Sequence, residues 1–254
     1  MGSRVRGWKS KKTMNDGEEM NINETIKSIR SCQEGCYKDR YIKSLPTLKN
    51  RIISVDELKR ALPLVDDYRG QKILFISQAP SKQAWADGQL STEKNAFLTE
   101  FLLPKVFKGM KISEALEIWK KRVFWLHTAN CYPFVFLDGK NKNRDMPPDQ
   151  KCANKYFELV VEGINPELIV LMGGSALIYF SASIKTQVDC KYKDPGIGEV
   201  VNWQYSSGMR LRIKTKNKEK TYEAIAVKHA VWDSLTVEQK KAYETFFQAI
   251  RDIK

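Results

Sequence analysis

Four short apolar runs recur along the chain, each bounded by polar or turn-forming residues. They are Lys72–Ser77, Val123–Leu126, Leu168–Met172 and Ala224–Val227. Continuous apolar runs of this length are typical of strands that are buried on both faces of a parallel sheet. We therefore expect these runs to form the core of one four-stranded sheet.

Amphipathic helical patterns lie between and after these runs. Apolar residues recur at helical spacing from Cys152 to Gly163. Thr236 and Gln239 have the spacing of a capping box, and a buried face follows from Tyr243 to Ile253. Another capping box is expected at Ser54–Glu57. Alternating strands and helices predict an α/β protein with three layers, α/β/α, around a central and mainly parallel sheet.

The segment from Glu199 to Thr221 departs from this alternation. It contains two runs of alternating character on either side of Ser206-Ser207-Gly208. Alternating runs around a short turn predict a β-hairpin, here inserted before the last core strand.

Charge and length narrow the possible partners and the domain organisation. The chain has 254 residues, 42% of them apolar, and 43 Lys and Arg against 30 Asp and Glu give a formal charge of +13. This excess favours an anionic polymer or a membrane surface as partner. Basic side chains are frequent among the first residues, so we expect a flexible basic arm over residues 1–22 and one domain over residues 23–254.

From the sequence we expect neither a membrane span nor an export signal. The longest apolar run that could form the interior of an element, Leu168–Met172, has five residues, whereas a helical span needs about 20. No apolar run follows the basic N-terminal residues. We therefore expect an intracellular protein, cytoplasmic or associated with the nucleoid or nucleus, which is not secreted and binds no membrane.

Both histidines of the chain follow predicted strands. His127 comes after Val123–Leu126, and His229 comes shortly after Ala224–Val227. Ligands of parallel α/β sheets bind at the carboxyl ends of the strands, so both are candidate functional residues, although each could be a structural hydrogen-bonding residue. The polar turn Gln78–Ser81 follows the first predicted strand and could bring backbone N–H groups to a ligand, or could simply end the strand.

Four of the five cysteines could bind a metal. They are Cys32, Cys36, Cys131 and Cys152, whereas Cys190 lies between Asp189 and Lys191 and has no evident ligand role. An odd number of cysteines without an export signal argues against a disulfide framework. Four thiolates could hold an iron–sulfur cluster or a zinc ion. Alternatively, Cys131 and Cys152 are small buried apolar residues.

Five segments occur in an order that is similar to a known family. They are Ser77–Ser81, Cys131-Tyr132-Pro133, Asn143–Gln150 shortly before Cys152, Ile164–Gly173, and His229-Ala230-Val231. In this order they resemble the Gly-Glu-Ala-Pro-Gly, Cys-Arg-Pro, Asn-Arg-Asp-Pro-x-Pro-Glu-Glu, Ile-x-Pro-x-x-Ile-x-x-Leu-Gly and His-Pro-Ser motifs of the uracil-DNA glycosylase superfamily, closest to its iron–sulfur branch, family 4. The resemblance covers roughly residues 30 to 250.

This resemblance implies a fold, an activity and a set of site residues. It implies a monomeric DNA repair enzyme that hydrolyses the N-glycosidic bond of a flipped-out uracil in DNA and leaves an abasic site. A [4Fe-4S] cluster would be held by Cys32, Cys36, Cys131 and Cys152, with a structural zinc ion as the alternative. The implied roles are: His229, Gln78 and Glu93 for catalysis, with Asp87 as an alternative to Glu93; Ala79, Trp85, His127 and Asn130 for base binding; Arg144, Ala230, Val231 and Trp232 for DNA contacts.

The chain also departs from the family pattern. Gln78 replaces the Glu of the first motif, Ser91 stands where a base-stacking Phe is expected, and His127 aligns with the Asn that reads the uracil edge. The spacing of Cys32 and Cys36 is one residue longer than usual. Three alternatives therefore stay open: a non-catalytic nucleic-acid-binding protein on this scaffold, a glycosylase for another damaged base such as hypoxanthine, and a nucleotide-binding protein that uses Gly173-Gly174-Ser175.

Overall fold

The computed structural model describes residues 21–32, 63–81, 84, 87–131, 135–137, 143–145, 150–189, 195–215, 220–229 and 235–253. In chain order the elements are α1 (Ile22–Arg30), β1 (Ile73–Ser77), the π-helix η2 (Phe97–Leu102), α5 (Leu103–Val106), α6 (Ile112–Arg122), β2 (Val123–His127), β3 (Val135–Leu137), β4 (Asn143–Asp145), α7 (Gln150–Ile164), β5 (Leu168–Met172), α8 (Gly174–Tyr179), α9 (Ser181–Lys185), α10 (Ile197–Ser207), β6 (Leu211–Lys214), β7 (Thr221–Val227) and α11 (Val237–Asp252).

The central sheet has five strands in the order β2-β1-β5-β7-β6. The first four are parallel to one another, and β6 is antiparallel to β7. The four predicted strands are therefore confirmed, and the chain is an α/β protein. The predicted strand number was wrong, because β6 adds a fifth strand at one edge.

The predicted hairpin was also wrong in its first half. Its first run lies in helix α10, and only Leu211–Lys214 forms a strand, which pairs with Thr221–Ala224 of β7. The first run forms a helix because the side chains that face the protein interior follow helical spacing. Val200 and Val201 are fully buried, and Gln204, one turn after Val200, bonds to the backbone of β7. These three side chains share one helical face, which a period of two cannot reproduce.

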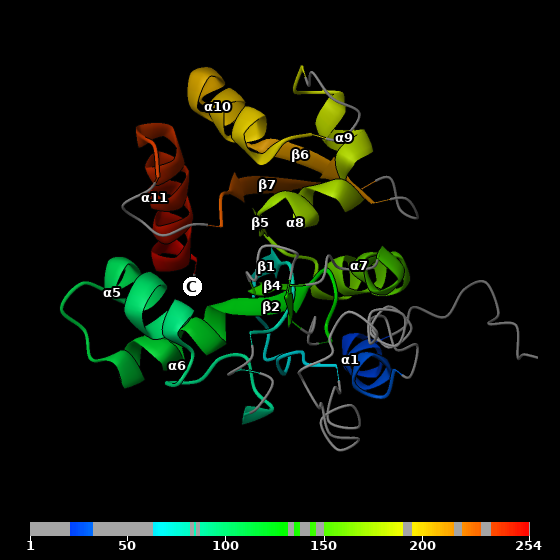
Figure 1. Cartoon of the computed structure of the whole chain (residues 1–254), viewed down its shortest axis with the longest axis vertical. Helices are drawn as coiled ribbons and strands as arrows, with labels where there is room; N and C mark the ends of the chain where they lie inside the picture. Colours follow the sequence, from blue (N-terminus) through cyan, green and yellow to red (C-terminus); the bar gives the residue numbers. More distant parts are fainter. Residues whose placement is uncertain are drawn as a thin grey trace, which may run out of the picture.

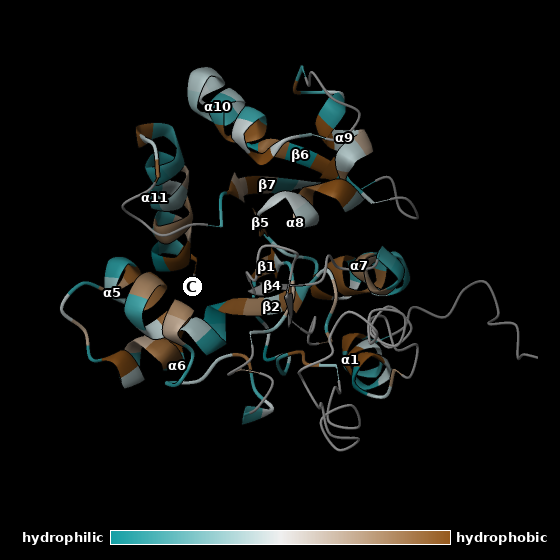
Figure 2. Ribbon diagram, viewed as in Figure 1, coloured by the Kyte–Doolittle hydropathy of each residue, from teal (hydrophilic) through white to brown (hydrophobic). Residues whose placement is uncertain are grey.

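Helices cover both faces of the sheet (Figure 1). Phe75 of β1 stacks on Phe246 of α11, with ring centroids 5.4 Å apart, and meets Trp119 of α6 edge to face. Helices α5, α6 and α11 therefore share one face, and α7 and α8 lie on the other, with α1 packed against α7. Figure 2 shows β2 largely in brown, the hydrophobic colour. Every residue of β1, β2 and β5 is buried, in agreement with a sheet that is covered on both faces.

The remaining predictions concern the N-terminal arm, three helices and the absence of a membrane span. The helix predicted at Ser54 lies outside the described residues, as do residues 1–20 of the predicted basic arm, whereas α1 begins at Ile22. The helices predicted over Cys152–Gly163 and after Thr236 are confirmed, and Thr236 and Gln239 form the expected capping box. Within the described ranges, no helix has the length and apolar character that crossing a bilayer requires.

The strand order creates a crevice between β1 and β5. The connection from β1 leads to β2 on one side, whereas the connection from β5 leads to β7 on the other side. Such a switch in direction leaves a crevice at the carboxyl ends of the two strands, where ligands of α/β proteins bind. The position of a site is thus fixed by topology before any side chain is considered.

Candidate functional site

A cavity of about 270 Å³ opens at the carboxyl ends of the parallel strands. We call it the strand-end cavity. Its wall includes Ser77 at the end of β1, His127 at the end of β2, Met172 at the end of β5, and His229 shortly after β7. Four strand ends therefore meet at one small hollow, as the sequence predicted for the two histidines.

His127 is held in the wall of the strand-end cavity as a neutral imidazole. Its side chain is only 1% exposed, and burial lowers its pKa to about 3. The ring stacks on Trp125 with centroids 5.4 Å apart, and the Trp125 indole N–H donates to the Ser77 hydroxyl at 2.8 Å. His127 Nδ1 is buried without a hydrogen-bond partner among the described residues.

Asn130 connects this histidine with the cysteines. Its Oδ1 accepts a hydrogen bond from the backbone N–H of His127 at 3.1 Å, and its Nδ2 donates to Cys152 Sγ at 3.2 Å. The side chain is fully buried and does not line the strand-end cavity. Asn130 was predicted to bind the base, but its amide groups are used within the protein.

The turn after β1 is fixed to the end of β2. The backbone N–H of Thr128 donates to the Ser77 carbonyl at 2.7 Å, and that of Ala129 donates to the Gln78 carbonyl at 3.1 Å. Gln78 and Ala79 both line the strand-end cavity. Gln78 Oε1 accepts a hydrogen bond from the Ser175 hydroxyl at 3.3 Å. Gln78 Nε2 has no hydrogen-bond partner in the described part of the chain.

His229 lies on the exposed rim of the same cavity. Its imidazole is nearly parallel to the ring of Phe97, with centroids 5.8 Å apart and an interplanar angle of 9°. The preceding residue is anchored because the Tyr243 hydroxyl donates to the Lys228 carbonyl at 2.8 Å. Phe97 is the first residue of the π-helix η2, a rare element that is frequent at functional sites.

The predicted carboxylates lie elsewhere. Glu93 is exposed and does not line the strand-end cavity. Asp87 lines a different hollow of about 630 Å³, together with Asp66 and Ser91. No Asp or Glu occurs among the described residues that form the wall of the strand-end cavity.

Other predicted site residues fall outside what the structure describes. These are Cys36, Trp85, Ala230, Val231 and Trp232, together with the side chain of Arg144. The backbone of Arg144 belongs to β4 and pairs with Phe136 of β3.

Three cysteines come from elements that pack close together. Cys32 follows α1, Cys131 follows β2, and Cys152 is in the first turn of α7, and none of them forms a disulfide. The Cys32 side chain hydrogen-bonds with the hydroxyl of Tyr156, one turn after Cys152. Their thiols are suitable metal ligands, but no group of three or more potential ligands is close enough to hold a metal within the described ranges.

Among the residues of the cavity wall that sequence reasoning did not identify are Asn95 and Phe97. Asn95 is 4% exposed and precedes η2. Ser91, which aligned with a base-stacking Phe, instead donates its hydroxyl to Asp66 Oδ2 at 2.7 Å. An aromatic ring is nevertheless present in the cavity, supplied by Phe97. A polar residue between two predicted elements gives no signal that its side chain points into a cavity.

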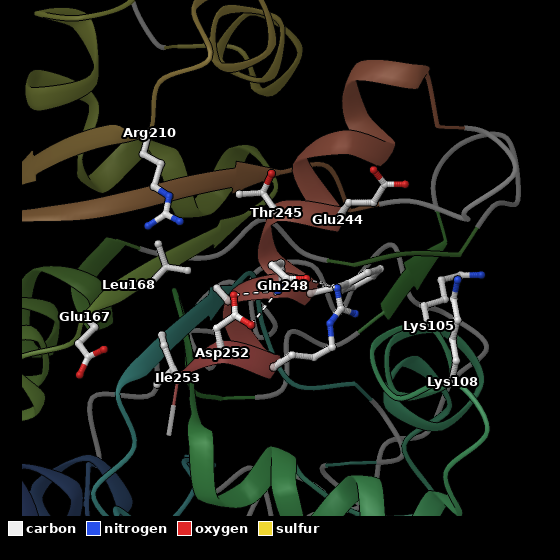
Figure 3. Close-up of a pocket in the computed structure, with 13 residues that line it drawn as sticks. Lys105, Lys108, Glu167, Leu168, Arg210, Glu244, Thr245, Gln248, Asp252 and Ile253 are labelled. Carbon is white, nitrogen blue, oxygen red and sulfur yellow. Dashed lines mark hydrogen bonds between the residues drawn. The ribbon is translucent and has the colours of Figure 1, made fainter.

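A larger groove of about 890 Å³ lies at the opposite edge of the sheet, where β5 begins (Figure 3). It mixes Lys105, Lys108 and Arg210 with Glu167, Glu244 and Asp252. Several of these charges are satisfied internally: Gln248 donates to Asp252, and Arg210 pairs with Glu223 at 2.6 Å. No buried side-chain atom that lacks a partner in the described chain lies there. The smaller strand-end cavity is therefore the better candidate site.

Comparison of the sequence with models of protein families and with curated proteins finds no match. The candidate function must therefore be argued from the residues of this site.

Proposed function

We propose that this protein is a DNA glycosylase that hydrolyses the N-glycosidic bond of a flipped-out uracil and leaves an abasic site. The observation that carries the proposal is the strand-end cavity, which brings together two histidines, Gln78 and the ring of Phe97. Its volume of about 270 Å³ is below the roughly 300–1,000 Å³ of pockets for drug-sized ligands. This size suits a single base and requires that the base leave the helical stack.

The chemistry needed is stabilisation of a leaving base and positioning of a water molecule. In the transition state the sugar becomes oxocarbenium-like and negative charge develops on the departing uracil. His229, on the cavity rim, would donate a hydrogen bond to uracil O2, a contribution of about 3 kcal/mol when such a donor is preorganised. Gln78 would orient the water, since its Oε1 accepts from Ser175 and retains a second lone pair.

A neutral amide cannot remove a proton from this water. As the C1′–N bond breaks and the C1′–O bond forms, the proton released by the water would therefore pass to the departing uracil anion, directly or through solvent. Because no carboxylate lines the described wall of the cavity, the proposed reaction depends on leaving-group stabilisation more than on general base catalysis. The DNA backbone would be held by the excess of basic residues, 43 Lys and Arg against 30 Asp and Glu, without regard to sequence. The proposal includes a structural centre on Cys32, Cys36, Cys131 and Cys152, either a [4Fe-4S] cluster or zinc.

One observation favours a second function, namely binding of nucleic acid without catalysis. Gln78 stands where the family that the chain resembles has a Glu, and the described cavity wall has no carboxylate. A protein of this kind would retain the base-sized cavity and the basic charge but would form no abasic product.

The test is incubation with an oligonucleotide that contains one uracil, followed by alkali to cleave at abasic sites. We expect cleavage by the wild type and a loss of about 100-fold or more in His229→Ala, as for removal of an oxyanion-type donor. The matched control is Tyr205→Ala on α10, which is exposed and does not line the strand-end cavity. Binding by the wild type with no cleavage of uracil, hypoxanthine or mismatched thymine substrates would support the second function and refute the first.

A further inference from the structure

Asn95 presents a fixed acceptor to the strand-end cavity. Its Nδ2 donates to the Leu90 carbonyl at 2.8 Å, so the orientation of the amide is determined. Its backbone is also held, because the N–H donates to the Thr92 carbonyl at 3.1 Å and the carbonyl accepts from Leu98. The side chain is 4% exposed and lines the cavity. Asn95 Oδ1 meets no donor in the described part of the chain.

His127 presents the complementary donor. Its Nδ1 is buried and unpartnered among the described residues, so Nε2 is the nitrogen left to meet a ligand in the cavity. Burial keeps the ring neutral, with one N–H and one bare nitrogen. An unsatisfied buried N–H is rarer in proteins than an under-satisfied acceptor. The proton therefore belongs on Nε2, where a ligand carbonyl can accept it.

We propose that Asn95 and His127 together read the adjacent N–H and C=O groups of a lactam ring, with Asn95 as the residue that selects deaminated bases. The inference rests on the proposed function and names its substrate class. Uracil carries N3–H beside a carbonyl, and hypoxanthine carries N1–H beside a carbonyl. Asn95 Oδ1 would accept from the ring N–H, and His127 would donate to the carbonyl oxygen.

The same arrangement rejects the parent bases. Cytosine and adenine have an unprotonated ring nitrogen at the corresponding position and an amino group beside it. Their ring lone pair would face Asn95 Oδ1, which places two acceptors against each other. Their amino group would face the His127 N–H, which places two donors against each other. A site built to hydrogen-bond one pattern discriminates strongly against its inverse, because its buried polar groups are left unpaired.

The experiment measures binding separately from cleavage. Oligonucleotides that carry 2′-fluoro-2′-deoxyuridine or 2′-fluoro-2′-deoxycytidine at one position resist glycosidic cleavage, because the fluorine disfavours the oxocarbenium ion. The readout is the ratio of the two dissociation constants. We expect wild type to prefer the uridine probe and Asn95→Leu to reduce this preference by about 5- to 150-fold, the range for one buried hydrogen-bonding partner.

Two further variants make the result decisive. Asn95→Ala removes the acceptor without adding a larger apolar side chain and should reduce the preference by a similar factor, so this arm tests the proposal where Asn95→Leu fails to fold. Thr99→Val is the matched control, since its hydroxyl donates to the Asn95 carbonyl but the residue does not line the cavity. A preference that survives in folded Asn95→Leu or in folded Asn95→Ala would overturn the inference. A wild type that neither binds nor cleaves uracil probes would instead refute the proposed function.

Discussion

The side-chain amide of Gln204 takes the place of a neighbouring strand beside Ala226. Gln204 Nε2 donates to the Ala226 carbonyl at 3.1 Å, and the Ala226 N–H donates to Gln204 Oε1 at 2.8 Å. Strand β6 pairs with β7 only as far as Ala224, so the end of β7 has no strand on this side. Helix α10 thus completes the hydrogen bonding of the strand that leads to His229.

We expect Gln204→Leu to lower the free energy of unfolding by about 1–3 kcal/mol, because it leaves two polar groups of a fully buried residue unpaired. Excision should also fall, since Ala226 lies three residues before His229. Urea unfolding and the uracil cleavage assay measure the two effects.

Gln187 provides the matched control for this substitution. Its amide bonds in the same way to both backbone groups of Arg212 on β6, at 2.5 and 2.7 Å, but that residue is exposed to solvent. Water can replace the lost partner there. Gln187→Leu should therefore lower the free energy of unfolding by less than about 1 kcal/mol and leave excision unchanged. Equal losses of stability in both variants would contradict the role assigned to burial.

Phe97 should control the orientation of His229. Phe97→Leu removes the parallel ring contact at 5.8 Å, and such a contact contributes about 0.5–1.5 kcal/mol. We expect kcat/KM for uracil excision to fall by about 2- to 12-fold if this contact is lost from the transition state. Phe101→Leu is the control, since Phe101 stacks on Phe97 but does not line the cavity. A larger effect of Phe101→Leu on excision would argue against direct positioning by Phe97.

The predictable and unpredictable parts of this protein differ in physical origin. The core strands follow from apolar runs, and His127 and His229 follow from their positions at strand ends, because parallel strands share one carboxyl edge. β6 was predicted as a hairpin strand but not as a fifth strand of the central sheet, because an alternating run does not show which strand it pairs with. α10 was assigned the wrong period. Asn95 and Phe97 reach the cavity only through the packing of η2 against the sheet, which no local pattern encodes.

The proposed centre on four cysteines leads to a prediction about the metal content of the protein. Protein purified without air should be brown and contain about four iron atoms per chain, as four thiolates imply. Cys152→Ser should lose the metal, whereas Cys190→Ser, which removes the cysteine without a proposed ligand role, should retain it. Metal analysis and the visible absorption spectrum give the readout. Colourless protein with zinc would assign the site to zinc, and metal-free protein would remove the centre altogether.

His127 should remain neutral at every pH at which the protein is folded and active. Its pKa is lowered to about 3 by burial, against about 6.5 in the unfolded chain. The unfolded state therefore binds a proton between these values while the folded state does not, so stability decreases as pH falls through this window, by up to about 1.4 kcal/mol per pH unit. NMR titration of the imidazole above pH 4 should show no protonation. A midpoint for His127 near 6.5 would contradict the buried, neutral state.

Asp66 should act on stability in the opposite direction. Burial raises its pKa from 3.8 to about 6, although the Ser91 hydroxyl bonds to the carboxylate and favours its charged form. The folded state therefore holds a proton that the unfolded state has lost between pH 3.8 and 6. The stabilisation is complete below pH 3.8 and is lost as the pH rises to 6.

Asp66→Asn mimics the protonated carboxyl and should remove this loss. We expect the free energy of unfolding of the variant to equal that of wild type near pH 4. At pH 7.5, where wild type must bury a charge, it should be higher than that of wild type by about 1–3 kcal/mol. Urea unfolding at a series of pH values measures the difference. Asp67→Asn is the control, because Asp67 is exposed and pairs with Arg30 at 2.7 Å, and exposed pairs contribute at most about 1 kcal/mol.

Because Ser91 and Asn95 belong to the same segment, a gain in stability without loss of excision would show that the charge on Asp66 is not needed to hold the cavity wall. A constant difference between Asp66→Asn and wild type across the pH range would contradict the raised pKa.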